Sequence, residues 1–354
     1  MPPRVSVVVT NFDGERYLPR MRDALRALEF PFHEIIVSDD ASRDGSRLFV
    51  RHHWPEARLV CGDVNGGPTV ARNRGLRAAS GELVLLLDND GLPQPGCMEP
   101  MLAAMDSAAD VAGVMPRVVL DSDPPLVHCD GARTHFSGQM ALVTGHVPLS
   151  TAPTAAQPIS SLMGTAMLLR RELALSIGGF EPAYFFYYED HDFGTRLRLC
   201  CGSLRSAPQA HIRHLGGTQN LSFRSGGRYP PRRAFLTARN RQLFTMRTLS
   251  ARSLVLLAPA LVLHECAQAL YSLAAGRFGL YAEACLANAR RFSGILRERA
   301  RLQAQRTVGD AAIISGGPLP LHPGTVGHPV ARKLLRGFSA GLCRWHRLVR
   351  PHLR

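Results

Sequence analysis

The first part of the chain alternates short apolar runs, rich in β-branched residues, with stretches of helical periodicity. This rhythm limits the possible folds more than any other feature. The expected strands are residues 5–9, 34–37, 58–61 and 83–87, and the expected helices are residues 16–28, 46–52 and 69–79. Strands that alternate with helices form a mostly parallel sheet covered by helices. Residues 83–87 are apolar throughout, which is typical of a strand buried on both faces. The sequence therefore predicts an α/β fold.

Three of the expected strands end in polar residues. These are Thr10 and Asn11 after the first strand, Asp39 and Asp40 after the second, and Asp88, Asn89 and Asp90 after the fourth. Ligands of parallel α/β sheets bind at the carboxyl ends of the strands. This position alone marks the three clusters as candidate binding residues.

Asp88 and Asp90 flank one residue directly after an apolar run. Carboxylate oxygens are hard ligands that suit Mg²⁺ or Mn²⁺, which commonly complete their coordination shell with substrate phosphates. An Asp-x-Asp pair by itself is more often a polar loop than a site. Its place at the end of a buried strand makes the two interpretations about equal.

A second acidic cluster follows an aromatic run in the middle of the chain. Glu189, Asp190 and Asp192 stand at the start of an expected helix over residues 190–199. Acids at a helix N-terminus ordinarily act as caps. Three acids are more than a cap needs, which favours a general base among them.

His211 and His214 bracket an expected short strand that ends at Gly216 and Gly217. A lone histidine is usually structural. Next to glycines that permit a sharp bend or a close ligand approach, a neutral imidazole would suit a further metal ligand. Another short strand is expected over residues 166–169, and residues 117–158 are expected to form loops and β-ribbons.

Taken in order, these motifs resemble the family 2 glycosyltransferases of the GT-A fold over about residues 4–245. The matching segments are residues 5–11, 35–46, 65–67, 71–75, 88–90, 178–181 and 189–193, with Arg196. The resemblance implies a Rossmann-like, mostly parallel sheet flanked by helices. It also implies a membrane-associated helical extension at the C-terminal end.

The resemblance implies a role for each candidate residue. Asp88, Asp90 and His214 would bind Mg²⁺ or Mn²⁺, with His211 as the alternative histidine. Asp190 would be the catalytic base, with Glu189 and Asp192 as alternatives. The nucleotide and substrate would contact Thr10, Asn11, Asp39, Asp40, Gly67, Arg72, Asn73, Asp88, Asn89, Glu189 and Asp192.

The reaction implied by the resemblance is inverting transfer of a hexosyl or rhamnosyl group from a UDP- or dTDP-sugar to an acceptor hydroxyl. The acceptor would be a glycan or a lipid-linked intermediate of polysaccharide or glycolipid synthesis. The alternatives are a metal-dependent nucleotidyltransferase and a non-catalytic, membrane-bound scaffold of the same fold. The acidic cluster at 189–192 argues against the first, and the intact acids with His214 argue against the second.

The net charge of +14 comes almost entirely from arginine, since Lys333 is the single lysine. Arginine binds phosphate through a planar fork, so phosphate-bearing partners and anionic membranes are both plausible. The chain has no helix-turn-helix or zinc-finger pattern, and we expect no nucleic-acid partner. Compositional bias of the source genome is an equally good explanation of the charge.

Residues 1–245 are expected to form the GT-A domain, with a nucleotide half over 1–115 and an acceptor half over 116–245. Residues 246–354 are expected to form a basic helical extension. Within it, residues 253–275 are apolar and long enough to span a bilayer. Glu265 inside this stretch would cost about 2.5–3.5 kcal/mol at the bilayer centre. A helix in the membrane interface or in the protein core is therefore favoured over one that spans.

The 8 cysteines include no Cys-x-x-Cys pair, which indicates a reducing compartment. The apolar run at residues 5–9 is too short for the hydrophobic region of a signal peptide. We expect a cytoplasmic protein that is peripheral on the inner face of the cell membrane. The basic stretches near the C-terminal end would either contact anionic lipid or form a solvated tail.

Overall fold

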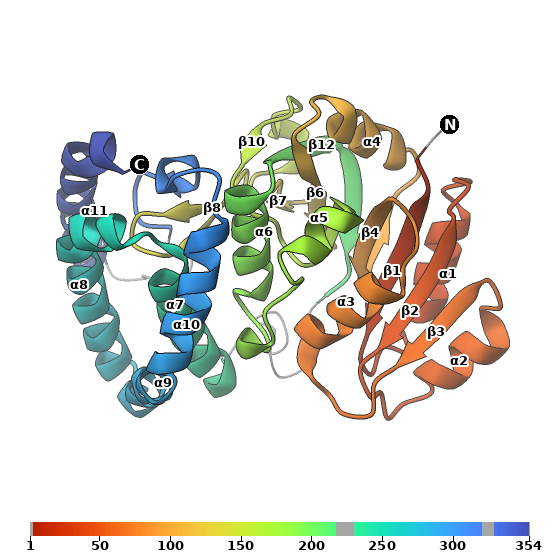
Figure 1. The fold of residues 1–354 in the computed structure, drawn as a ribbon, viewed down its shortest axis with the longest axis horizontal. Helices are drawn as coiled ribbons and strands as arrows, with labels where there is room; N and C mark the ends of the chain where they lie inside the picture. The colour runs from red at the N-terminus through yellow and green to blue at the C-terminus, as the bar shows by residue number, and fades with distance from the viewer. Residues whose placement is uncertain (1–2, 217–229, 321–328, 354) are drawn as a thin grey trace. The chain divides into compact units, whose positions relative to one another are not determined.

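The computed structural model describes residues 3–216, 230–320 and 329–353 (Figure 1). Gly217, expected to end the strand after His214, lies outside the described residues, as do residues 321–328 in the basic C-terminal part. The chain divides into two compact units. The first comprises Met1–Ala132 with Val143–Arg228, and the second comprises Arg133–Leu142 with Tyr229–Arg354.

Among the described residues of the first unit, ten strands form one mixed sheet. Eight of them follow the order β10-β12-β6-β11-β4-β1-β2-β3, while β5 pairs with β12 and β7 pairs with β6. The strands are β1 (Val5–Asn11), β2 (Glu34–Asp39), β3 (Ala57–Cys61), β4 (Leu83–Asp88), β5 (Gly91–Pro93), β6 (Val111–Leu120), β7 (Val127–Cys129), β10 (Pro158–Ile159), β11 (Ala166–Arg170) and β12 (Ser203–His214). The strands β1, β2, β3 and β4 run parallel, and so do β6 and β12. Because β11 runs antiparallel to both β4 and β6, it joins the two parallel parts.

Helices cover both faces of this sheet (Figure 1). They are α1 (Leu18–Arg26), α2 (Ser46–His53), α3 (Gly67–Ala78), α4 (Met98–Asp106), α5 (Arg171–Ser176) and α6 (Glu189–Cys200), with short 3₁₀ turns at Leu149–Thr151 and Pro182–Tyr184. The mixed sheet with helices on both faces agrees with the expected α/β fold class.

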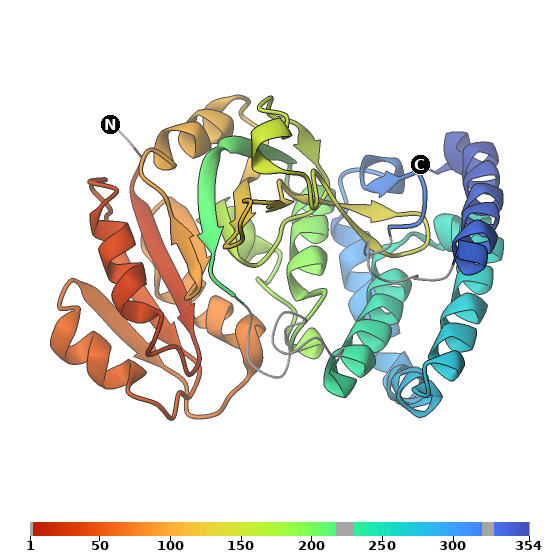
Figure 2. The same cartoon turned by 180° about the vertical axis from the view of Figure 1, so that it is seen from behind.

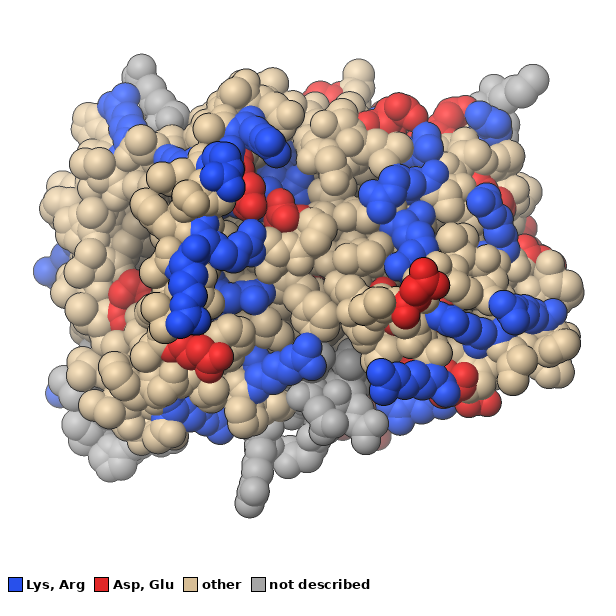
Figure 3. Space-filling view, turned by 60° about the horizontal axis from the view of Figure 1, so that its bottom comes forward, with Lys and Arg blue, Asp and Glu red and all other residues tan. Residues whose placement is uncertain are grey.

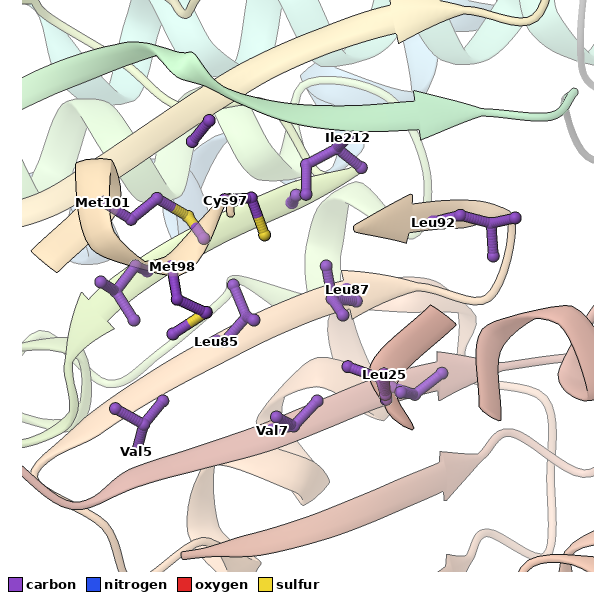
Figure 4. Close-up of a cluster of buried hydrophobic side chains, with 14 of the residues drawn as sticks. Val5, Val7, Leu25, Leu85, Leu87, Leu92, Cys97, Met98, Met101 and Ile212 are labelled. Carbon is purple, nitrogen blue, oxygen red and sulfur yellow. The ribbon is translucent and has the colours of Figure 1, made fainter. Parts of the chain in front are cut away.

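One face of the sheet carries a hydrophobic core of buried residues (Figure 4). Val7, Leu87 and Ile212 from three strands pack in one buried cluster with Leu25 of α1 and Met98 of α4. Side chains alternate across a strand, so the apolar runs supply both faces. The cluster holds α1, α2 and α4 against this side of the sheet.

The opposite face is covered by α3, α5 and α6. Val8 and Ile36, which are fully buried, point to this side because they alternate with the residues of the first core. Gly75 brings α3 close to β1, since a Cβ at this position would lie 2.2 Å from Cγ1 of Val8. The position of α3 matters for the site because this helix carries Arg72 and Asn73.

Each expected strand and helix of the first ninety or so residues is present, with ends that differ by one or two residues. The expected short strand at 211–214 is the end of a strand twelve residues long, β12, seen from behind in Figure 2. Its first half lacks an apolar run and contains Pro208, and the pairing with β6 is interrupted between Ala207 and His211. Because of this irregularity, the first half of the strand has no regular hydrophobic pattern from which it could be predicted. In the stretch expected to be irregular, β6 extends to Leu120.

The described part of the second unit is mainly helical. Its elements are β8 (Ala132–His135), β9 (Met140–Leu142), β13 (Ile314–Ser315), α7 (Pro231–Thr248), α8 (Ala251–Ala274), α9 (Phe278–Arg290), α10 (Phe292–Gln305), α11 (Pro329–Val349) and two 3₁₀ turns at Asp310–Ala312 and Arg350–His352. The helix α7 packs against α9 and α10, and α8 packs against α9 and α11. The expected boundary at residue 245 falls inside α7, which belongs wholly to the second unit.

Candidate active site

The carboxyl ends of the parallel strands bring the polar residues of the sequence motifs side by side. Thr10 stands opposite Asp88 in the pairing of β1 with β4, and Asn11 stands opposite Asp39 in the pairing of β1 with β2. The Thr10 hydroxyl donates to Oδ1 of Asp88 at 2.9 Å, and Nδ2 of Asn11 donates to Oδ2 of Asp39 at 3.0 Å. Nδ2 of Asn89 also donates to Oδ1 of Asn11, at 2.7 Å. The three strand ends therefore form one polar network.

Asp39 is completely buried within this network. Its Oδ1 accepts the Ser42 N–H at 3.1 Å and Nε of Arg47 at 2.6 Å. Burial alone would raise the pKa of Asp39, but the hydrogen bonds from Ser42, Arg47 and Asn11 outweigh it and hold the pKa below its ordinary value. Asp39 is thus an ionised, oriented carboxylate. Arg47 was not anticipated from the sequence, although its place in the helix after the Asp39 loop could have suggested it.

Asp40 organises the turn at the start of α3. Its Oδ2 accepts the Gly67 N–H at 2.7 Å, and Nη2 of Arg74 lies 3.7 Å from its Oδ1. Gly67 has a φ of +79°, and a Cβ there would lie 2.7 Å from the Phe185 carbonyl oxygen. Only glycine accommodates both the left-handed conformation and this close approach. Gly67 therefore shapes the turn around Asp40.

Arg72 of α3 joins Asp88 to Glu189 of the second acidic cluster. Its Nη2 donates to Oδ1 of Asp88 at 2.8 Å and its Nη1 donates to Oε1 of Glu189 at 3.0 Å. The guanidinium is almost completely buried and lies over the ring of Phe180. An arginine fork can serve two carboxylates at once because its donors are held in one plane. The two acidic motifs, distant in sequence, share this one cation.

Glu189 is the less accessible acid of the pair at the start of α6. Burial raises the pKa of Glu189 to about 8, with a further contribution from neighbouring Asp190, and Arg72 offsets only part of this rise. Its Oε2 is buried and has no hydrogen-bond partner among the described residues. Glu189 therefore carries a proton over part of the neutral pH range.

Asp190 is oriented by two backbone groups. Its Oδ2 accepts the Gly164 N–H at 2.8 Å, and its Oδ1 accepts the His191 N–H at 2.7 Å. The side chain is 8% exposed, and its burial raises the pKa of Asp190 above the ordinary value. A carboxylate held in this way has one orientation and a higher proton affinity than an exposed aspartate.

Gly164 and Thr165 connect Asp190 to Asp88. The Gly164 N–H binds Asp190, and the carbonyl of the next residue, Thr165, accepts the Asp88 N–H at 3.0 Å. The segment 164–165 immediately precedes β11, which pairs antiparallel with β4. Its role was missed from the sequence, where a single glycine before a strand carries little signal.

Asp192 and Asn73 take part in internal contacts. Both carboxylate oxygens of Asp192 are engaged, one by the Tyr184 hydroxyl at 3.0 Å and the other by Nε of Arg196 at 2.6 Å. Asn73 makes a double hydrogen bond with the backbone of Phe180, at 2.7 Å in each direction. Asp192 is completely buried and forms an ion pair with Arg196, whereas Asp190 is 8% exposed and accepts from backbone N–H groups, which favours Asp190 as the base. Substrate contact by Asp192 and Asn73 stays a prediction.

Two of the three expected metal ligands are in contact. Nε2 of His214 lies 3.2 Å from Oδ2 of Asp90, and the ring of His128 stacks on that of His214 at 5.7 Å. Asp88 instead interacts with Thr10 and Arg72. Among the residues that the structure describes, no three His, Cys, Asp or Glu side chains are grouped closely enough to hold an ion.

The Asp90 and His214 pair nevertheless fits a hard divalent cation in its donor chemistry, one carboxylate and one imidazole. Nδ1 of His214 is buried and lacks a hydrogen-bond partner in the described part of the chain. The alternative ligand, His211, has a lowered pKa through burial and the nearby charge of Arg117. The contact of His214 with Asp90 favours His214 over His211 as the ligand.

Comparison with known proteins identifies the N-terminal part of the chain. Residues 6–174 match the family model described as glycosyl transferase family 2. These residues form a family 2 glycosyltransferase domain. Asp39, Arg72, Asp88 and Asp90 lie inside the matched residues, whereas Asp190 and His214 lie beyond them.

The family 2 domain has relatives that carry glycosyltransferase names. The chain is 28% identical over 234 residues to N-acetylglucosaminyl-diphospho-decaprenol L-rhamnosyltransferase of Mycobacterium tuberculosis, covering 59% of this chain and 75% of that protein. It is 29% identical over 221 residues to the pre-mycofactocin glycosyltransferase of the same species, covering 61% and 43%. An uncharacterized glycosyltransferase of Nostoc sp. is 31% identical over 115 residues, covering 32% of this chain and only 35% of that relative.

Solved structures show that the fold is shared. GalNAc-T7, solved with UDP, GalNAc and Mn²⁺, matches with a TM-score of 0.54 and 16% identity, over 72% of this chain and 49% of that chain. The mannosyltransferase PcManGT of Pyrobaculum calidifontis, solved with GDP-Man and Mn²⁺, matches with a TM-score of 0.50 and 16% identity, over 99% and 87%. These matches confirm the expected GT-A fold class of the family 2 domain.

Proposed function

We propose that the chain is an inverting glycosyltransferase that moves a sugar from a nucleoside-diphosphate sugar to an acceptor hydroxyl with the help of a divalent cation. The observation that carries the proposal is the segment 164–165, which hydrogen bonds Asp190 through one residue and the backbone of Asp88 through the next. Because the two contacts come from adjacent residues, they support a single site in which Asp190 acts as the base and Asp88 binds the donor. The family 2 domain and the names of its relatives support the reaction class.

For the donor, we propose that Asp39 and Asn11 bind the base of the nucleotide and that Asp88 binds its ribose. Asp39 is buried and ionised, so it can accept hydrogen bonds from base N–H groups at low cost of reorganisation. Thr10, Asp40, Gly67, Arg72 and Asn89 line the same strand ends. The nucleotides bound to GalNAc-T7 and to PcManGT support a nucleotide-linked donor, either UDP- or dTDP-linked here.

Asp190 takes the proton of the acceptor hydroxyl in this proposal. The acceptor oxygen attacks the anomeric carbon opposite the leaving diphosphate, so the configuration at that carbon inverts. The two backbone N–H groups on Asp190 orient its carboxylate, and its raised pKa strengthens it as a base. General-base help of this kind typically contributes about 10²–10⁴ in rate.

Asp90 and His214, together with Asp88, would hold Mg²⁺ or Mn²⁺. When bound, a divalent cation neutralises the charge that develops on the leaving diphosphate. Arg72 keeps Asp88 oriented, because Asp88 accepts from both Arg72 and Thr10. The Mn²⁺ bound to GalNAc-T7 and to PcManGT supports a divalent cation.

For the acceptor, we propose a glycan or lipid-linked intermediate of cell-surface polysaccharide or glycolipid synthesis, glycosylated on the cytoplasmic side of the membrane. The M. tuberculosis relative is named for rhamnosyl transfer to N-acetylglucosaminyl-diphospho-decaprenol. This name supports a rhamnosyl or hexosyl donor and a lipid-linked acceptor.

A donor screen by nucleotide release tests the proposal. The purified chain is incubated with UDP-hexoses and dTDP-rhamnose, with Mn²⁺ or with a chelator, and the anomeric configuration of the product is read by NMR. We expect one donor to release its nucleoside diphosphate only with the cation and to give an inverted product. Release of pyrophosphate would instead indicate a nucleotidyltransferase, and the absence of both turnover and donor binding would indicate a scaffold.

A further inference from the structure

Three histidine rings lie next to one another in the first unit. The ring of His128 stacks on that of His214, with 5.7 Å between the ring centroids and 24° between the ring planes. The ring of His146 lies 6.4 Å from that of His128 and is tilted by 54°. Aromatic rings at such separations attract one another. His128 therefore contacts a proposed cation ligand, His214, through the face of its ring.

The three histidines come from separate segments that meet around β6. The strand β12, which ends at His214, and the strand β7, which contains His128, pair with the same two residues of β6 and so lie along its two edges. The His146 N–H donates to the Val127 carbonyl at 2.8 Å, and the Val127 N–H donates to the Val147 carbonyl at 2.8 Å. Backbone pairing thus places all three rings at the same end of β6.

A buried ion pair fixes the segment that carries His128. Nε and Nη2 of Arg117 on β6 each donate to one carboxylate oxygen of Asp130, at 2.7 Å in both cases. Arg117 is 2% exposed and Asp130 is 3% exposed. A bidentate pair of this kind sets distance and direction together. Because Asp130 follows His128 by two residues, the pair limits how far the His128 ring can move away from His214.

The orientation of the His214 ring needs such support. Its Nε2 faces Oδ2 of Asp90 at 3.2 Å, whereas its buried Nδ1 has no hydrogen-bond partner among the described residues. In most metal sites the second ring nitrogen of a histidine ligand donates to a carboxylate, a carbonyl or a water, and that hydrogen bond fixes the ring. Stacking on His128 instead restrains the plane of the His214 ring.

The charge of the chain makes the placement of each cation ligand more important. The net charge is +14, and basic side chains are spread over the face of the molecule shown in Figure 3, whereas acidic ones form a few small groups. A positive surface field lowers the local concentration of cations. A divalent cation must therefore be retained by well-placed ligands, because the field of the whole protein does not attract it.

The stacked arrangement also argues against His128 as a ligand in its own right. The nitrogen lone pairs of an imidazole lie in the plane of its ring. Two nearly parallel, stacked rings are therefore poorly placed to direct lone pairs at one ion beside Asp90. The ring face of His128, and not its nitrogen atoms, is what His214 contacts.

We propose that His128 is a positioning residue of the cation site, which holds the ring of His214 by stacking so that Nε2 faces the cation beside Asp90. The inference rests on the cation site of the proposed function and adds to it a residue that touches neither the cation nor the substrates. It requires the aromatic ring of His128 but none of its nitrogen atoms.

Mn²⁺ binding to the full chain tests the proposal without any measurement of transfer. The titration follows the EPR signal of free Mn²⁺ in the presence of UDP or dTDP, and a protein-free titration corrects for Mn²⁺ held by the nucleotide. We expect His128→Ala to weaken Mn²⁺ binding by about 10- to 100-fold, the range typical of residues that orient a metal ligand. His128→Phe keeps an aromatic ring without ring nitrogens, so it should bind Mn²⁺ within about threefold of the wild type.

The double variant His128→Ala, His214→Ala separates positioning from a general loosening of the fold. If His128 acts through His214, its loss should have no further effect once His214 is absent, so the double variant should bind Mn²⁺ as His214→Ala does. His53→Ala on α2 is the matched control, because His53 is exposed and its ring packs on that of Phe49 at 5.6 Å. It should leave Mn²⁺ binding unchanged.

Thermal unfolding of all variants shows which are folded, and the double variant decides alone if His128→Phe is not. The proposal is wrong if His128→Ala binds Mn²⁺ as tightly as the wild type, or if it weakens binding further in the absence of His214. Weak binding by a folded His128→Phe would also overturn it, since His128 would then be a ligand. If the wild-type chain takes up no Mn²⁺ beyond that held by the nucleotide, the cation site itself is wrong, and the role of His128 with it.

Discussion

Arg72 connects two carboxylates that stand far apart in the chain, since Glu189 lies 117 residues after it and Asp88 lies 16 residues after it. All three side chains meet where the strands end, and Arg72 is almost fully buried. Removing this buried cation leaves Asp88 without its ion pair and Glu189 without its hydrogen-bond donor, which costs more than the pair itself contributes.

We therefore expect Arg72→Ala to lower the free energy of unfolding by about 3–5 kcal/mol. The matched control is Arg58→Ala, because Arg58 is exposed and makes one long hydrogen bond to the Ala78 carbonyl at 3.3 Å. Its loss should change stability by less than about 0.5 kcal/mol. Urea unfolding of both variants checks the difference, and equal effects would show that the Arg72 bridge contributes nothing to stability.

Glu189 makes stability depend on pH in a direction opposite to that of most carboxyl groups. Its pKa is raised from 4.5 to about 8, so between these values the folded chain holds a proton that the unfolded chain has lost. The stabilising effect of the protonated form is fully present below about pH 4.5 and is lost as pH rises toward 8. Glu189→Gln, which cannot lose a proton, should flatten this decline.

Urea unfolding at several pH values between 5 and 8 checks this prediction. Glu172→Gln is the control, since Glu172 is exposed and the same Glu-to-Gln replacement there should leave the decline unchanged. A decline of equal slope in the wild type and in Glu189→Gln would contradict the assigned proton.

At the scale of elements, the close packing of α3 on β1 depends on Gly75. A Cβ at Gly75 would lie 2.2 Å from Cγ1 of Val8, whereas a Cβ at Gly279 in α9 would meet nothing within 4 Å. The same substitution should therefore have opposite effects in the two helices. Gly75→Ala should destabilise the chain by about 1–3 kcal/mol through overpacking, and Gly279→Ala should stabilise α9 by about 0.5–1 kcal/mol.

Thermal unfolding of the two variants compares the signs of these effects. Gly75→Ala should also weaken binding of a nucleotide, because α3 carries Arg72 into the site. A neutral Gly75→Ala would mean that α3 can move away from β1 without cost.

The elements near the start of the chain could be predicted from sequence because each follows from local periodicity. The strand ends then place Thr10, Asp39 and Asp88 together, since parallel neighbours share one edge. Only the end of β12 was predicted, because its first half contains Pro208 and its pairing with β6 is interrupted before His211. Local pattern does not encode an interruption that depends on the neighbouring strand.

The contacts of single side chains were the least predictable part of the site. The sequence indicated the acids at 189–192 but not their partners, and only the packing shows that Asp192 pairs with Arg196 whereas backbone N–H groups hold Asp190. The Gly164 hydrogen bond to Asp190 crosses 26 residues and depends on how β11 pairs with β4. Long-range contacts of this kind follow from tertiary structure and leave no periodic signal.

In the molecule as a whole, the candidate catalytic residues and the excess positive charge lie in different parts of the chain. The acids of the candidate site belong to the first unit, and the positive excess of the sequence belongs to residues 230–354. Because the excess charge is exposed to salt, any contribution to binding a charged surface should fall as ionic strength rises. The buried network around Asp39 and Arg72 should be much less sensitive to salt.

The proposed reaction depends on Asp190 as the base and on Asp90 as a ligand of the cation. The direct measurement combines transfer activity with the rise in melting temperature that UDP or dTDP produces in the presence of Mn²⁺. Asp90→Ala should lose both the nucleotide- and metal-dependent rise and the transfer activity, because it removes a cation ligand.

Asp190→Asn should keep the rise in melting temperature and lose transfer by about 10²–10⁴, since the amide preserves the shape but cannot take a proton. Retained transfer in Asp190→Asn would show that Asp190 is not the base. Loss of the thermal shift in Asp190→Asn together with its retention in Asp90→Ala would show that the two roles are wrongly assigned.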